Sequence, residues 1–219
     1  PKQKIDLTLS KDLIENLEKL EAFFEESSDI IFREFKLGLN EIPCAVIYVD
    51  GAIDTDIVNS HILKSLMYQI TILEENRKRP IDNIQAFDGI KQHAVSVGEI
   101  EEIDNLEDAM YAILSGDIIL IIDGFNKFIG VSAKGWPTRG VAEPEGEVTI
   151  RGSREGFTEL IRFNTALLRK RCKDPNFIIK GMKIGKRSKT GVAYAYIKGI
   201  VNPKLVEKVE RRLDAIDID

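Results

Sequence analysis

The chain has 219 residues, of which 43% are hydrophobic, 31% charged and 7% aromatic. This composition excludes a wholly disordered chain, and no apolar run approaches the roughly 18–20 residues of a membrane-crossing helix. Two cysteines, Cys44 and Cys172, do not make the dense disulfide framework of a small secreted protein, so we expect reduced thiols in the cytosol.

The formal net charge of −5 hides a strong asymmetry along the chain. Residues 151–191 contain 12 Lys/Arg and three acids, a net charge of +9, which leaves 19 basic and 33 acidic residues, or −14, elsewhere. Three interpretations of such a basic stretch are open: it forms a solvated face, it packs against the acidic part of the same molecule, or it binds an acidic partner. Among partners we rank an acidic protein surface first and an anionic membrane second. Nucleic acid comes last, because the stretch has few aromatic side chains to stack on bases.

The first part of the chain predicts a helix, two strands and a second helix. In chain order these are a helix over residues 13–24 capped by Ser10, a strand over 34–37 ending at Gly38, a buried strand over 45–49 ending at Asp50-Gly51, and a helix over 58–73 capped by Asp54. Further along, a helix over 105–115 precedes two strands, 118–122 and 125–131, around Asp123-Gly124. That dipeptide indicates a tight hairpin, because the turn needs positive φ.

The last part repeats the first. A helix with Phe157, Leu160, Ile161 and Leu168 on its apolar side comes first, followed by a strand that ends at Gly185 and a strand over 192–197 that ends at Lys198-Gly199. The last element is a helix capped by Asn202, with Pro203 at its first position. Its apolar side is formed by Val206, Val209 and Leu213. Four residue pairs are 148 positions apart: Tyr48/Tyr196, Gly51/Gly199, Asp54/Asn202 and Val58/Val206. Two others, Asp29/Asp174 and Gly38/Gly185, differ by 145 and 147. The pattern predicts a divergent internal duplication, with two unrelated units of similar order as the alternative.

The predicted fold class is therefore α/β (α+β), with two subdomains that each contain a small mixed β-sheet and packed helices. Residues 135–146 are rich in Pro and Gly and are predicted to link a subdomain over 1–134 to one over 147–219. We expect the rest of the second copy to lie beyond Asp219.

The search for catalytic chemistry finds no supported site. Residues 181–188 superficially resemble a phosphate-binding loop, but the glycine spacing is short and a strand, not a helix, is predicted next. The two histidines, His61 and His93, lack metal-ligand spacing with the cysteines. We therefore predict no enzyme activity, no cofactor and no metal.

Two features of the basic helix stand out. Asn164 lies on its apolar stripe, so its amide should be hydrogen-bonded, either to the linker or a strand end, or to a ligand in a cleft. The charges of Arg162, Arg169, Lys170 and Arg171 are expected on its outer face. On that view, charge reversal at Arg169 and Arg171 leaves the domain folded.

The stretch from Trp136 to Pro203 resembles the hallmark region of A-subunits of spore germination receptors. The residues that carry the resemblance are Arg139-Gly140, Glu143-Pro144-x-x-Glu147, Arg151-Gly-x-Arg154-Glu155-Gly-Phe157, Asn164, Arg169, Arg171 and Asp174-Pro175. The resemblance continues upstream through Asp50-Gly51 and Asp123-Gly124, so it covers most of the chain. Two positions depart from the usual pattern, with Ser153 in place of Pro and Cys172 in place of Ile.

The resemblance implies a soluble N-terminal domain on the cytoplasmic face of the spore inner membrane, with a membrane-spanning part that follows and is not in this chain. Partners would be the B- and C-subunits of the receptor and other A-subunits, and the role would be assembly and signal coupling without established catalytic residues. The candidate functional or interface residues are Arg139, Glu143, Glu147, Arg151, Arg154, Glu155, Asn164, Arg169 and Arg171. The alternative is a free-standing cytosolic module that binds a small ligand in a cleft between subdomains; contact with anionic lipid stays open.

Overall fold

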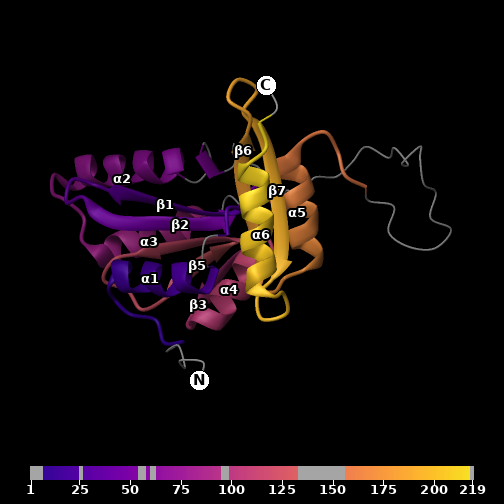
Figure 1. Ribbon diagram of the computed structural model, residues 1–219. Coiled ribbons are helices and arrows are strands. Elements are labelled where there is room, and N and C mark those ends of the chain that lie inside the picture. Colours follow the sequence, from indigo (N-terminus) through magenta and orange to yellow (C-terminus); the bar gives the residue numbers. More distant parts are fainter. Residues whose placement is uncertain are drawn as a thin grey trace.

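The structure is a computed structural model that describes residues 7–24, 27–53, 58–59, 63–94, 99–132 and 156–217. This part of the chain forms six helices and seven strands (Figure 1). The helices are α1 (Leu13–Phe24), α2 (Lys64–Arg77), α3 (Asn83–Ala94), α4 (Leu106–Leu114), α5 (Ile161–Arg171) and α6 (Pro203–Asp214). The strands are β1 (Ile30–Leu37), β2 (Ile42–Val49), β3 (Ile100–Ile103), β4 (Ile118–Ile122), β5 (Phe128–Val131), β6 (Phe177–Ile184) and β7 (Thr190–Ile197).

Residues 7–132, here called the sheet unit, contain a five-stranded sheet in the order β1-β2-β4-β5-β3. Every pairing in it is antiparallel, so the expectation of a mixed sheet is wrong. The three inner strands β2, β4 and β5 are apolar because both faces of the sheet are covered: β4 and β5 are buried throughout, and β2 is buried from Cys44 onward. In Figure 1, α2 lies on one side of the strands, and α1 and α4 lie on the other.

Residues 156–217, here called the hairpin unit, consist of the antiparallel pair β6–β7 with α5 and α6 beside it (Figure 1). Helix α6 begins as predicted, with Pro203 in its first turn and the side chain of Asn202 accepting the N–H of Lys204. None of its residues is fully buried. Its predicted apolar side, which includes Val206 and Leu213, is only half-buried.

Several local predictions need correction. Helix α1 is capped by Asp12, whose carboxylate accepts the N–H groups of Ile14 and Glu15, rather than by Ser10. The strands around Asp123-Gly124 are not joined by a two-residue turn, because their register pairs Leu120 with Ile129 and leaves a longer connection. Gly124 does have a positive φ of 91°. Helix α3 and strand β3 were not predicted from the sequence.

The turns of the two hairpins have the same backbone geometry. Gly38 and Gly185 follow the first strand of each pair with φ of 69° and 90°, and Gly51 and Gly199 follow the second with φ of 76° and 86°. The same backbone hydrogen bond closes both hairpins, from Asp50 N–H to the carbonyl of residue 29 and from Lys198 N–H to that of residue 176. The counterpart of Asp29 is therefore Asn176, not Asp174. A duplication as such is not shown, since one hairpin belongs to a five-stranded sheet and the other stands as a pair.

The predicted linker over 135–146 and the predicted cap Asp54 lie outside the described residues, so the division into subdomains stays a prediction. Across the ranges that the structure describes, no helix has both the length and the apolar character to cross a membrane.

The cap of α4 gives a direct test of the fold. Asn105 Oδ1 accepts the N–H of Asp108 at 2.9 Å, so Asn105 is the cap of a helix that was predicted to begin at this residue. Asn105→Ala removes this acceptor and should lower the free energy of unfolding by about 1 kcal/mol in urea titrations. Asn105→Ser keeps an acceptor and should lose less; equal stability of the Ala variant and the native chain would contradict the assignment.

Candidate functional site

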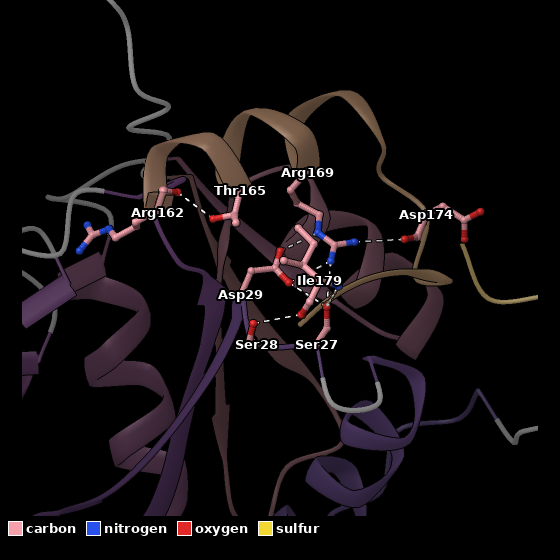
Figure 2. Close-up of polar contacts among 8 residues, drawn as sticks. All are labelled: Ser27, Ser28, Asp29, Arg162, Thr165, Arg169, Asp174 and Ile179. Atoms are coloured by element: carbon pink, nitrogen blue, oxygen red, sulfur yellow. Dashed lines mark hydrogen bonds and ion pairs between the residues drawn. The ribbon is translucent and has the colours of Figure 1, made fainter. Parts of the chain in front are cut away.

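The sheet unit and the hairpin unit meet at a junction to which each unit contributes two segments. The loop between α1 and β1 binds α5 and the start of β6 (Figure 2), and the turn after β2 contacts the start of α5. We treat this junction as the candidate functional site, because it is where a change in one unit would reach the other.

The centre of the junction is a buried arginine, Arg169, with 0% of its side chain exposed. Its guanidinium holds the Asp29 carboxylate in a two-pronged ion pair, with Nε–Oδ2 at 2.7 Å and Nη2–Oδ1 at 2.9 Å. The same group donates to Ser27 Oγ at 3.1 Å and to the carbonyl of Asp174 at 3.2 Å. It also lies 5.0 Å from the ring centre of Phe177, a distance typical of a cation–π contact.

The hydroxyl of Ser27 extends this cluster to β6. It donates to Asp29 Oδ1 at 2.8 Å and accepts the N–H of Ile179 at 3.0 Å. The next residue, Ser28, donates its own N–H to the carbonyl of Ile179 at 2.8 Å. The loop of the sheet unit therefore binds both the helix and the first strand of the hairpin unit, and the polar groups at the centre are mutually satisfied.

A second contact lies at the start of α5. Gly51 approaches the helix so closely that a Cβ at this position would sit 2.7 Å from the carbonyl oxygen of Arg162 and 3.2 Å from the Cβ of Ala166. Its positive φ also favours glycine. Beside it, Asp50 and Arg162 form a partly exposed ion pair at 3.3 Å. Exposed pairs of this kind contribute little to stability, so the close packing at Gly51 is the stronger constraint.

The junction joins parts of opposite charge. Residues 7–132 contain 10 basic and 24 acidic residues, and residues 156–217 contain 15 basic and six acidic residues. Asp29 and Asp50 on one side meet Arg169 and Arg162 on the other. Part of the charge asymmetry of the sequence is thus used for attraction within the molecule.

A cavity of about 310 Å³ opens beside the cluster and is lined by both units. Its charged lining residues include Asp50, Arg162 and Lys183, and the hydroxyl of Thr165 also faces it. Asp29 also lines the cavity, so two carboxylates and two cations surround a space that suits a small ligand carrying both signs of charge.

Of the nine predicted site residues, three are described, and all lie in α5. Arg169 is in the junction, which corrects the expectation that it lies on the outer face, whereas Arg171 is exposed as expected. The helix begins only at Ile161, and the side chains of Phe157 and Leu160 before it are exposed, so the predicted apolar stripe is wrong. The other six predicted site residues lie outside the described part of the chain: Arg139, Glu143, Glu147, Arg151, Arg154 and Glu155.

Asn164 binds backbone through both ends of its amide. Its Oδ1 accepts the N–H of Thr158 at 2.6 Å, and its Nδ2 donates to the carbonyl of the same residue at 2.8 Å. The side chain is half-buried. It therefore holds irregular backbone just before α5. The predicted linker lies outside the described residues, and a role of Asn164 in setting the angle between the units stays a prediction.

The described residues offer little for catalysis. No three His, Cys, Asp or Glu side chains among them are arranged to hold a metal ion. Burial, with a smaller effect of the Asp123 charge, raises the pKa of the Cys44 thiol to about 12. At neutral pH this thiol is protonated, so it is a poor nucleophile.

The buried ion pair predicts a sharp contrast between two neighbouring arginines. Arg169→Met leaves the Asp29 carboxylate buried without its partner and should lower the free energy of unfolding by about 3–5 kcal/mol. Arg171→Met, at an exposed position of the same helix, should change it by less than about 0.5 kcal/mol. Chemical denaturation measures the free energy of unfolding of both variants. Equal losses of stability in the two would contradict the buried position of the Arg169 ion pair.

Asn164→Leu keeps the volume of the side chain but removes its three hydrogen bonds with Thr158, two of them to the backbone. We expect the free energy of unfolding to fall by about 1–3 kcal/mol, because the Thr158 backbone groups lose their partners. Asn164→Asp keeps only the hydrogen-bond acceptor, so its free energy of unfolding should lie between those of Asn164→Leu and the native chain. A melting curve of Asn164→Leu equal to that of the native chain would show that the amide does not stabilise the fold.

Comparison with known proteins gives matches along most of the chain. The family model described as Bacillus/Clostridium GerA spore germination protein matches residues 18–219. The uncharacterized membrane protein YfkQ of Bacillus subtilis (strain 168) is 35% identical over 98% of this chain and 40% of its own length. Spore germination protein B1 of the same organism is 32% identical over 97% of this chain and 42% of its own length. The chain thus spans about two fifths of these relatives.

A solved structure matches as well. The crystal structure of the N-terminal domain of the A subunit of the Bacillus megaterium spore germinant receptor GerK3 superposes with a TM-score of 0.75 at 32% identity. The match covers 98% of this chain and 76% of the solved one. Both the family match and the structural match extend over the residues that form the junction. The chain belongs to the GerA family of spore germination proteins.

Proposed function

We propose that the chain is the N-terminal domain of the A-subunit of a spore germinant receptor, and that it acts in receptor assembly and in coupling the nutrient signal to germination. Support comes from the family match and from the likeness to the GerK3 domain. On this proposal the domain is part of a receptor rather than an enzyme. Its partners are the B- and C-subunits and other A-subunits, at the cytoplasmic face of the spore inner membrane.

The observation that carries the coupling role is the buried cluster around Arg169. A two-pronged ion pair that is dry, fully hydrogen-bonded and closely packed has one good geometry. If α5 slid over the sheet unit, these charges would be exposed to water or left buried without their partners. The two units therefore move as one body, and a displacement at either end is passed to the other instead of being absorbed at the junction.

A conservative variant tests coupling without unfolding the domain. Arg169→Lys keeps the charge but loses the two-pronged geometry. In spores that carry the full-length receptor, we expect normal receptor levels and a severalfold slower response to nutrient. Arg171→Lys is the matched control, and a trigger that bypasses the receptor should act equally on all strains. A normal nutrient response of the Arg169→Lys spores would contradict the coupling role.

A second candidate function, small-ligand binding, is favoured by the cavity beside the junction. Asp50 and Arg162 come from different units and both line it, so a ligand held there would contact both units. Calorimetric titration of the chain with a panel of amino acids and sugars tests this function. A binder should lose at least about tenfold in affinity with Arg162→Ala, and absence of binding across the panel would argue against this candidate.

A further inference from the structure

The end of the sheet unit that lies opposite the junction has a surface of its own. Strand β1 starts next to Asp29 in the junction and ends at Leu37, so the turn after it, residues 38–41, lies at the other end of the sheet (Figure 1). The end of α2 and the loop after it, residues 77–81, lie against this turn.

One buried carboxylate holds the turn and the loop together. Glu74 is 5% exposed, and its oxygens accept the N–H of Leu39 at 3.0 and 3.1 Å and the N–H of Ile81 at 3.1 Å. The side-chain amide of Asn40 donates to the carbonyl of Ile81 at 2.8 Å. Gly38 leaves space for the carboxylate, because a Cβ at this position would lie 2.8 Å from Glu74 Oε1. The two segments therefore present their exposed side chains in a fixed arrangement.

Three consecutive basic residues lie at this end. Arg77, Lys78 and Arg79 are exposed, and none of their side chains forms an ion pair or a hydrogen bond within the described part of the chain. Two acids flank them in sequence: Glu75 is exposed, and the Asp82 carboxylate accepts the N–H of Gln85 at the start of α3. Four other basic residues of the sheet unit are paired with carboxylates: Lys19, Lys36, Lys91 and Lys127.

The backbone at the middle residue of the three would favour glycine. Lys78 ends α2 with φ of 53° and ψ of 32°, the left-handed conformation that glycine adopts most readily at helix ends. The chain thus carries a positive charge at a position where glycine would suit the backbone better. This argues that the charge itself is used.

An apolar side chain accompanies the charges. Leu39 is 73% exposed, although its backbone N–H is fixed by Glu74. Basic side chains beside a protruding apolar one suit an anionic membrane, because the charges lie among the headgroups while the apolar group enters the boundary with the acyl chains. The rest of the sheet unit carries most of its 24 acids and would be repelled by the same surface, so contact would be made by this end alone.

We propose that this basic tip, formed by Leu39, Arg77, Lys78 and Arg79, binds the surface of an anionic membrane. The inference rests on the proposed position of the domain at a membrane and adds which end of the sheet unit faces the lipid. One positive charge near such a surface is worth about fivefold in affinity. Three charges and one apolar side chain give weak binding, which becomes effective when the domain is tethered at the membrane.

Flotation of the purified chain with lipid vesicles tests the contact. We expect the chain to float with vesicles of phosphatidylcholine and phosphatidylglycerol in equal amounts, not with phosphatidylcholine alone, and to be released as salt is added. Lys78→Glu and Arg79→Glu should each lower the affinity by at least about tenfold, because each changes the charge by two. Lys64→Glu, the same change at an exposed position at the other end of α2, should alter it by less than about twofold.

Two further variants separate binding from folding. Lys78→Gly should keep or raise the melting temperature, because glycine suits the left-handed backbone, and should still lose about fivefold in affinity. Leu39→Ser should weaken binding without changing its dependence on salt, because no charge is removed. Lower affinity together with a higher melting temperature in Lys78→Gly cannot arise from partial unfolding.

The proposal is overturned if the native chain floats equally with both kinds of vesicle, or with neither at millimolar lipid. It is also overturned if Lys78→Glu, Arg79→Glu and Lys64→Glu weaken binding equally. Binding to polyglutamate without flotation, lost in the tip variants, would assign the tip to an acidic protein instead of lipid. None of these results would alter the nutrient response predicted for Arg169→Lys spores, so the membrane contact and the proposed function fail separately.

Discussion

The architecture of the chain depends on the burial of one ion pair between two parts that share no sheet. Arg169 and Asp29 are almost wholly removed from water, with side-chain exposures of 0% and 2%. Burying two charges costs about as much as their attraction returns, so such a pair adds more to geometry than to stability. It is tolerated here because Ser27, the Asp174 carbonyl and the face of Phe177 satisfy the rest of the guanidinium. An apolar contact in this place would hold the units together but would allow α5 to slide; the fork of Arg169 does not.

The backbone places a second constraint at the same junction. Gly51 brings the turn after β2 within van der Waals contact of α5, which a larger residue would prevent. The ion pair and the glycine lie seven residues apart along the helix, at Arg169 and Arg162, so they fix both its position and its direction. Two separated contacts on one helix resist rotation as well as translation. This is the physical reason to treat the sheet unit and the hairpin unit as one body.

The sequence predicted the elements whose signals are local. The apolar run of β4, the helix that became α4 and the Asn202-Pro203 start of α6 all appear as expected, because apolar runs and capping depend on near neighbours. The junction could not be found this way. Asp29 and Arg169 are 140 residues apart, and an arginine within the run Arg169-Lys170-Arg171 reads as a solvated charge, since only the tertiary structure distinguishes it from its neighbours. The apolar residues Phe157 and Leu160 misled for a different reason: their spacing fits a helix, but α5 begins only at Ile161 and both side chains before it are exposed.

The two hairpins show how one backbone geometry can serve opposite purposes. Both end in a glycine with positive φ, and both close through the same backbone hydrogen bond. The side chains on that common frame differ in sign: Asp50 in the first turn pairs with Arg162, and Lys198 occupies the corresponding place in the second. If both turns carried the same charge, the second would compete with the first for Arg162 and Arg169 of α5. A basic second turn removes that competition, because it is repelled by these arginines. The reversal of charge thus leaves the basic side of α5 to the first turn.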